Sequence, residues 1–124
     1  MKKINPNSSS KDNNFDREQY LYLTTQGRKS GRPREIEIWF TQRDGRFYVI
    51  AEYPTSNWLR NLQADRHAQV RVGGESFTVY ARLVDPESEP ELHRAVSGLS
   101  REKYSWGDGT VVELAPTAGD RNGQ

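Results

Sequence analysis

Several short stretches of the chain alternate between hydrophobic and polar residues, and this period of two predicts β-strands. The clearest is EIEIWFT at residues 35–41, where Ile36, Ile38 and Phe40 share one face and the residues between them share the other. Similar patterns predict strands at residues 20–25, 46–52, 68–72, 76–84 and 110–114. Two dipeptides, Asp44-Gly45 and Gly73-Gly74, separate neighbouring strands and are typical of tight hairpin turns.

Two other stretches have the helical period. Residues 55–65 offer Thr55, Ser56 or Asn57 as a helix N-cap, followed by apolar residues spaced for one face of a short helix. Residues 85–104 begin with acidic side chains, which suit a helix N-terminus, and continue with apolar residues at helical spacing.

About six strands joined by hairpins, with two to three short helices, predict a mainly β (α+β) fold. In this fold an antiparallel sheet closes toward a small barrel, with helices at its ends. Residues 16–116 would form this single domain, because a chain of 124 residues has room for one core. Residues 1–15 and 117–124 are polar and lack periodicity, so we expect disordered tails there.

Composition narrows the function classes. The chain has no cysteine, which excludes disulfides, thiol catalysis and cysteine-ligated metal. The longest apolar run is far shorter than the roughly 20 residues of a membrane span, and no secretory signal is visible. We therefore expect a cytoplasmic protein without a stable membrane anchor. His67 and His93 lack partners at metal-ligand spacing, so we expect no metal site.

Positive charge is concentrated in one loop between two predicted strands. Residues 27–34, GRKSGRPR, contain four cations: Arg28, Lys29, Arg32 and Arg34. Without these four, the 18 lysines and arginines fall to 14 against 17 acids, and the net charge changes from +1 to −3. Such a concentration indicates a local anionic partner.

Three interpretations of this loop compete. A solvated hairpin would keep a sheet edge soluble, although four close cations repel one another unless something offsets them. KSGRPR resembles the AT-hook of DNA-binding proteins, but such hooks lie in disordered basic tracts, so we expect no nucleic-acid partner. In the third, Gly27 and Gly31 let backbone N–H groups face a phosphate or carboxylate, and the cations and Ser30 donate further hydrogen bonds. This last interpretation favours an anionic small molecule held against the barrel.

The stretch LTTQGRKSGRPREIEIWF at residues 23–40, followed by SNWLRNLQAD and VRV, resembles the deazaflavin-dependent nitroreductase and quinone reductase family. The resemblance can be followed from about residue 20 to residue 114. It implies a split β-barrel related to pyridoxamine-phosphate oxidases. It also implies coenzyme F-420, a deazaflavin with a phosphate, a lactyl group and a glutamate tail. The implied activity is an oxidoreductase that passes hydride to a quinone, nitroaromatic or enone.

Carried over position by position, the resemblance implies twelve cofactor-binding residues. The basic loop would hold the phosphate and the acidic tail, the strand after it would run along the deazaflavin, and the short helix would close over the cofactor. No catalytic residue is implied. The twelve are Arg28, Lys29, Ser30, Arg34, Glu35, Ile36, Trp39, Ala51, Tyr53, Asn57, Trp58 and Asn61.

Two features leave alternatives open. The family's loop after the third strand is compressed to AEYPTSNW here, and Glu52 and Tyr53 replace a small hydroxyl residue and a lysine. An FMN-binding reductase, or a non-catalytic carrier of either cofactor, therefore remains an alternative. Near the C-terminus, Tyr104 and Trp106 would line the substrate pocket, or Trp106 would plug the barrel end. Because the superfamily usually dimerises, we also expect a homodimer.

Overall fold

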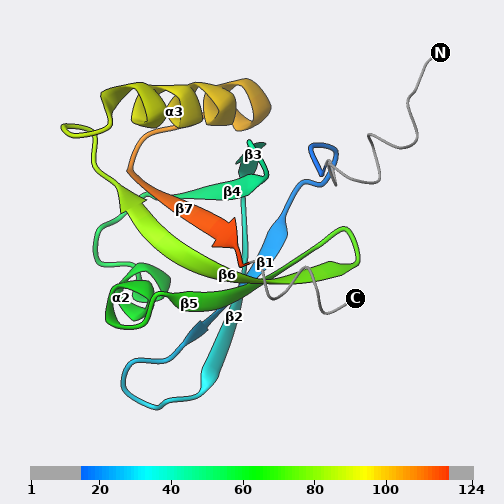
Figure 1. Cartoon of the computed structure of the whole chain (residues 1–124), viewed down its shortest axis with the longest axis vertical. Coiled ribbons are helices and arrows are strands. Elements are labelled where there is room, and N and C mark those ends of the chain that lie inside the picture. Colours follow the sequence, from blue (N-terminus) through cyan, green and yellow to red (C-terminus); the bar gives the residue numbers. More distant parts are fainter. Residues whose placement is uncertain (1–14, 118–124) are drawn as a thin grey trace.

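The computed structural model describes residues 15–117, which form seven β-strands and two α-helices (Figure 1). The strands are β1 (Leu21–Gln26), β2 (Pro33–Ile38), β3 (Thr41–Arg43), β4 (Arg46–Ala51), β5 (His67–Val72), β6 (Glu75–Val84) and β7 (Thr110–Pro116). The helices are α2 (Asn57–Ala64) and α3 (Pro90–Tyr104). Neither of these two described helices has the length and apolar character needed to cross a membrane.

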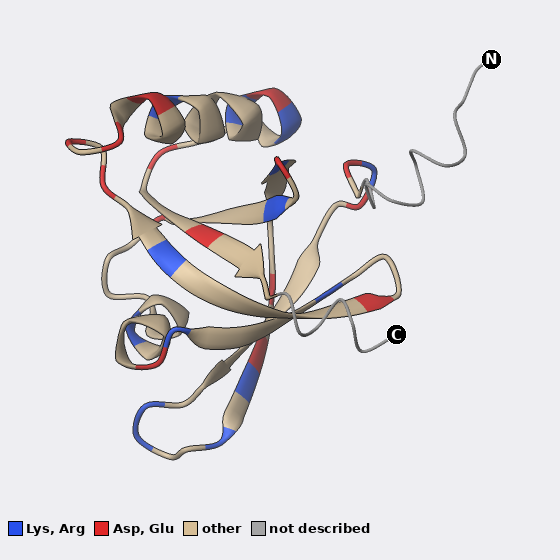
Figure 2. Ribbon diagram, in the orientation of Figure 1, with Lys and Arg blue, Asp and Glu red and all other residues tan. Residues whose placement is uncertain are grey.

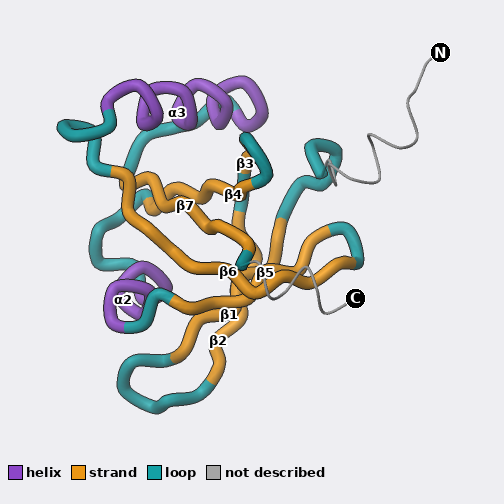
Figure 3. The backbone as a smooth tube through the Cα atoms, in the orientation of Figure 1, coloured by secondary structure: helices purple, strands orange, loops and turns teal. Residues whose placement is uncertain are grey.

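The seven strands form one antiparallel sheet in the order β2-β1-β5-β6-β7-β4-β3. β2 and β3 are its two edges, although only Trp39 and Phe40 separate them in the chain. Six strand spacings of about 4.8 Å each are too wide for two residues to cross, since an extended residue covers roughly 3.5 Å. The sheet therefore curls until its edges approach each other, and forms the half-barrel seen in Figures 1 and 3.

The inside of the half-barrel holds the main hydrophobic core. β5 shows how the sequence directs side chains there, because its six residues alternate between exposed and buried. Four phenylalanines form a connected group in which ring centroids lie 5.5–6.1 Å apart: Phe15, Phe40, Phe47 and Phe77. Phe40 lies in the link between the two sheet edges. Its burial therefore anchors this link in the core and stabilises the curled shape of the sheet.

Helix α3 covers part of the outer face of the sheet, over β4 and β7 (Figure 1). Val96 of the helix packs with Tyr48, Val84 and Val111 in a second buried cluster. β4 is therefore covered on both sides, and its three central residues are all buried. Because neither face of β4 is open to solvent, β4 lacks the alternation of buried and exposed residues that β5 shows.

The sequence predictions agree with this architecture in most respects. The mainly β antiparallel barrel is confirmed, and so are both hairpin turns, whose Asp44, Gly45, Gly73 and Gly74 have positive φ angles. The structure has one strand more than the expected six. Residues 35–41 form no single strand, because the chain leaves one edge of the sheet there and joins the other.

Smaller differences concern the element ends. The second predicted helix begins at Pro90 instead of residue 85, because Asp85 accepts the Glu87 N–H at 2.9 Å in a preceding turn and proline suits the first helical position. The expected tails lie outside the described residues except for Phe15 and Thr117. Phe15 is buried in the core, so this residue belongs to the domain and not to the expected tail.

Candidate functional site

The loop between β1 and β2 folds into a compact turn. The Gly31 N–H donates to Gly27 O at 2.8 Å, and the Gly27 N–H donates to Arg32 O at 2.8 Å. Gly31 has a φ of +75°, in the left-handed region that favours glycine. A Cβ atom on Gly27 would lie 2.7 Å from Ser30 Oγ and 3.1 Å from Arg32 O. The closure of this turn therefore depends on both glycines.

Most backbone N–H groups of the loop are used inside the protein. Besides the two glycine N–H groups, the Arg28 N–H donates to Asn61 Oδ1 at 3.1 Å, and the Arg32 N–H donates to Ser30 Oγ at 3.1 Å. Four of the six N–H groups of residues 27–32 thus have intramolecular acceptors. The two glycine N–H groups are therefore not directed at an anion, and of these six only the N–H groups of Lys29 and Ser30 have no acceptor among the described residues.

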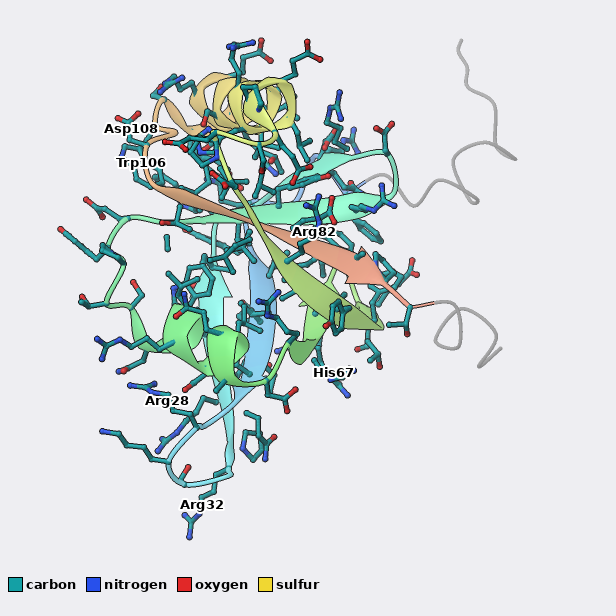
Figure 4. All side chains as sticks on the ribbon, turned by 60° about the vertical axis from the view of Figure 1, so that its left-hand side comes forward. Arg28, Arg32, His67, Arg82, Trp106 and Asp108 are labelled. Carbon is teal, nitrogen blue, oxygen red and sulfur yellow. The ribbon has the colours of Figure 1, made fainter. Side chains whose placement is uncertain are left out.

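A groove of about 710 Å³ lies between this loop, the beginning of β2 and helix α2. Figure 2 shows the blue ribbon of the loop beside α2, and Figure 4 shows Arg28 near the helix and Arg32 at the far tip of the loop. The groove is lined by Thr25, Gly27, Arg28, Lys29, Ser30, Pro33, Arg34, Glu35, Ile36, Asn57, Trp58 and Asn61. It therefore combines charged, hydroxyl, amide and apolar side chains on one surface.

Arg28 connects the loop to α2. Its Nη1 donates to Asn61 Oδ1 at 2.8 Å, and its Nη2 donates to Asn57 Oδ1 at 3.3 Å. Asn61 in turn donates from Nδ2 to Thr25 Oγ1 at 3.1 Å. Thr25 and Asn61 are 2% and 4% exposed, so this part of the polar chain is buried at the floor of the groove. Buried polar groups are rarely left without partners, and here each of them has one.

The other loop cations are not paired. Within residues 15–117, none of Lys29, Arg32 and Arg34 forms an ion pair, and their side chains make no hydrogen bond to another described residue. All three are exposed, but only Lys29 and Arg34 line the groove. The groove therefore has two positive side chains whose donors are available to a bound anion.

The acidic residues of β2 pair across the sheet instead of with the loop. Glu35 accepts a hydrogen bond from Arg71 Nη2 at 3.1 Å, and Glu37 accepts one from the Tyr22 hydroxyl at 3.0 Å. Glu35 also lines the groove, so Arg71 offsets a negative charge there. Glu35 and Arg71 therefore form a cross-strand ion pair between β2 and β5.

Nine of the twelve predicted cofactor-binding residues line this groove, and Trp39, Ala51 and Tyr53 do not. Ala51 is 2% exposed and belongs to the barrel core, whereas Tyr53 is 60% exposed on the surface. Thr25 and Pro33 also line the groove, although the sequence predicts no binding role for them. Both lie within the quoted signature, so that motif was the signal that pointed to them.

Trp39 instead joins the two predicted substrate-pocket residues. Its ring stacks on Tyr104 with centroids 4.4 Å apart, and it meets Trp106 edge-on at 6.4 Å. The Tyr104 hydroxyl accepts the Phe40 N–H at 3.0 Å and lies 2.8 Å from Gln19 O. Burial is the main reason why the pKa of Tyr104 is raised, so the phenol stays protonated at neutral pH. Through these contacts, the link of Trp39 and Phe40 between the sheet edges packs against the end of α3.

The two histidines are not assembled into a metal site. His67 lies at the start of β5, where its Nδ1 is 3.1 Å from Asp65 Oδ1 on the surface (Figure 4). In the described part of the chain, no three histidine, aspartate or glutamate side chains gather closely enough to hold a metal ion.

Comparison with known proteins adds family information to this geometry. A family model described as F420H(2)-dependent quinone reductase matches residues 4–112. An F420H(2)-dependent quinone reductase of Mycobacterium tuberculosis is 32% identical over 79 residues, which are 60% of this chain and 52% of that protein. The chain thus spans about half the length of the curated relatives it matches.

Two solved structures share the fold. One is an F420-H2 dependent reductase, with 19% identity, a TM-score of 0.64 and coverage of 77% of this chain and 93% of the other. The second is a Listeria innocua protein named for pyridoxamine 5'-phosphate oxidase, with 18% identity, a TM-score of 0.58 and coverage of 82% and 86%. At these identities the likeness concerns the fold alone, and it confirms the expected pyridoxamine-phosphate-oxidase-like split barrel.

Proposed function

We propose that this chain, which belongs to the F420H(2)-dependent quinone reductase family, binds coenzyme F-420 in the groove between the β1–β2 loop and α2. With the reduced cofactor it acts as an oxidoreductase on a quinone, a nitroaromatic or an enone. The observation that carries the proposal is a pair of cations without acidic partners beside apolar side chains in one groove. Such a site suits a planar ring that carries an anionic tail.

The residues of the groove fit the two parts of this cofactor. Lys29 and Arg34 would bind the phosphate and the tail carboxylates, since both present charged donors that no described residue uses. The Ser30 hydroxyl accepts the Arg32 N–H and keeps its own hydrogen to donate to an oxyanion. Ile36 and Trp58 are half-buried in the groove and offer apolar surface to a flat ring.

A bound, reduced deazaflavin supplies the hydride, and the protein supplies binding, orientation and electrostatics. Neither Tyr53 nor Tyr104 lines the groove, and the Tyr104 hydroxyl is held by Phe40 and Gln19. We therefore assign no catalytic residue among residues 15–117. The proton that completes the reduction would come from water that reaches the open groove.

Parallel fluorescence titrations of the full chain with oxidised coenzyme F-420 and with FMN test the proposal. We expect F-420 to bind and FMN to bind more weakly or not at all. Lys29→Gln and Arg34→Gln should each weaken F-420 binding by about tenfold, because each removes one charge-assisted contact. Arg60→Gln is the matched control, since Arg60 is an exposed arginine of α2 outside the groove, and it should leave the affinity unchanged.

The titrations have outcomes that contradict the proposal. Binding of FMN alone would make this chain a flavin protein, and binding of neither would refute the cofactor assignment. Turnover of reduced F-420 with a quinone then tests activity, and tight binding without turnover would favour a carrier. The expected cytoplasmic homodimer stays a prediction, for which light scattering of the purified protein and cell fractionation are the tests.

A further inference from the structure

We infer that Arg28 is a positioning residue, which latches the β1–β2 loop onto helix α2 and so holds Lys29 and Arg34 beside the groove. The inference rests on the proposed function, because it concerns how the same groove is kept in a binding shape. It gives Arg28 a different role from the direct phosphate contact that the family resemblance implies. In this role Arg28 acts through Asn61.

The first argument is the saturation of Asn61. A side-chain amide oxygen accepts about two hydrogen bonds, and both acceptor sites of Asn61 Oδ1 are taken by Arg28, one from its backbone N–H and one from Nη1. One Nδ2 hydrogen is donated to Thr25 Oγ1. At 4% exposure, Asn61 has little surface left for a cofactor. The hydrogen bonds of the Asn61 side chain to described residues all connect β1, the loop and α2.

The second argument is the direction of the Arg28 guanidinium. Its hydrogen bonds to described residues go to Asn61 Oδ1, Asn57 Oδ1 and the Asn57 carbonyl, all of them on α2. Each acceptor is neutral, so the guanidinium keeps a net positive charge while its donors point at the helix. A planar fork is needed to reach both asparagine side chains at once, and a lysine ammonium would keep the charge without this geometry.

The third argument is the position of Arg28 in the loop. Lys29 follows it directly, and the turn closed by Gly27 and Gly31 brings the chain to Arg34. Because the side chains of Lys29 and Arg34 have no bond to another described residue, only the loop backbone sets where their charges lie. Arg28 ties that backbone to α2, through its own N–H to Asn61 and through its side chain to Asn61 and Asn57.

The test separates charge from geometry by using Arg28→Lys, which keeps the charge and loses the fork. We expect this variant to bind coenzyme F-420 about tenfold more weakly, with the same salt dependence as the wild type. Lys29→Gln loses a charge, so its affinity should fall less steeply with added salt. Arg60→Lys, on the exposed side of the same helix, is the matched control and should bind as the wild type does.

A double-mutant cycle tests whether Arg28 acts through Asn61. Arg28→Lys combined with Asn61→Ala should bind no more weakly than the weaker of the two single variants, because both remove the same latch. If the double variant instead lost affinity by the product of the two single-variant losses, the inference would be overturned. That result would mean that each side chain contacts the cofactor separately. Wild-type affinity in Arg28→Lys would overturn it as well.

Hydrogen exchange of the ligand-free protein provides a readout that needs no cofactor. If Arg28 is the latch, Arg28→Lys should speed exchange of the Gly31 and Arg32 amides several-fold and leave the core strands protected. Unchanged exchange at the loop would overturn the inference. If the wild type failed to bind F-420, the proposed function would fall while this measurement still decided whether the latch exists.

Discussion

The arginines of the β1–β2 loop and Arg82 of β6 lie in contrasting environments. Arg82 donates to Glu113 at 3.2 Å and also binds Glu89, so two carboxylates surround one guanidinium. The loop contains four cations within seven residues, and none of them forms an ion pair within the described part of the chain. Figure 2 shows blue next to red on β6 and β7, and blue segments between tan ones, without red, along the loop.

This comparison distinguishes charged side chains that stabilise the fold from charged side chains that are available to bind a ligand. Glu113 lies opposite Tyr48 on β4 and Arg82 on β6, and it accepts hydrogen bonds from both. Tyr48 packs with Val96 of α3 and Glu113 is buried, so this ladder contributes to folding. Among the loop cations, Arg28 is hydrogen-bonded to neutral groups of α2, whereas Lys29, Arg32 and Arg34 have no partner among the described residues that offsets their mutual repulsion. This is the arrangement expected of a binding site for an anion.

Glu113→Ala is the strongest way to test this comparison. The change leaves the Tyr48 hydroxyl, in a residue that is 2% exposed, without its acceptor, and leaves Arg82 with Glu89 alone. We expect the free energy of unfolding to fall by about 3 kcal/mol, measured by urea denaturation. Glu102→Ala, at an exposed glutamate of α3, is the control and should change it by less than about 0.5 kcal/mol. A similar small loss for both would remove the distinction between the two regions.

The pH dependence of stability sharpens the same point. Burial alone would raise the pKa of Glu113, but hydrogen bonds from Arg82 and Tyr48, together with the Arg82 charge, outweigh it and lower the pKa. A carboxylate with a lowered folded-state pKa adds stability above its unfolded pKa and loses it as the pH falls through the folded value. Below about pH 4, wild-type stability should therefore decline more steeply than that of Glu113→Gln. Parallel declines in denaturation series from neutral to acid pH would contradict this.

Local patterns predicted the parts of the fold that depend on neighbouring residues. β5 alternates because one face is buried, and the hairpin turns have glycines where positive φ is required. The loop was found because its cations stand out in a chain that is otherwise acidic. These signals lie within a few residues of one another, so a single sequence contains them.

Contacts between distant residues left no such signal. Arg28 and Asn61 are 33 positions apart, and Arg82 and Glu113 are 31 apart, so neither pairing follows from periodicity. The family resemblance implies a place for Trp39 beside the cofactor, on the strand that follows the basic loop. The curl of the sheet instead carries it to Tyr104 at the end of α3. A reversal of this kind depends on closure of the whole sheet, which no local pattern records.

Arg71→Gln has the smallest expected effect and tests the boundary between the two kinds of charge. Arg71 pairs with Glu35 at 3.1 Å, but their side chains are 51% and 48% exposed, so the loss of the pair should cost less than about 0.5 kcal/mol of stability. Glu35 also lines the groove, and without Arg71 its charge would repel a bound anion. We expect F-420 affinity to fall about threefold at low salt and less at high salt. Adding Glu35→Gln to Arg71→Gln should restore the affinity, because it removes the carboxylate that Arg71 offsets. If the affinity stayed low in the double variant, Arg71 would itself contact the ligand, and the paired and unpaired cations would no longer divide into structural and binding groups.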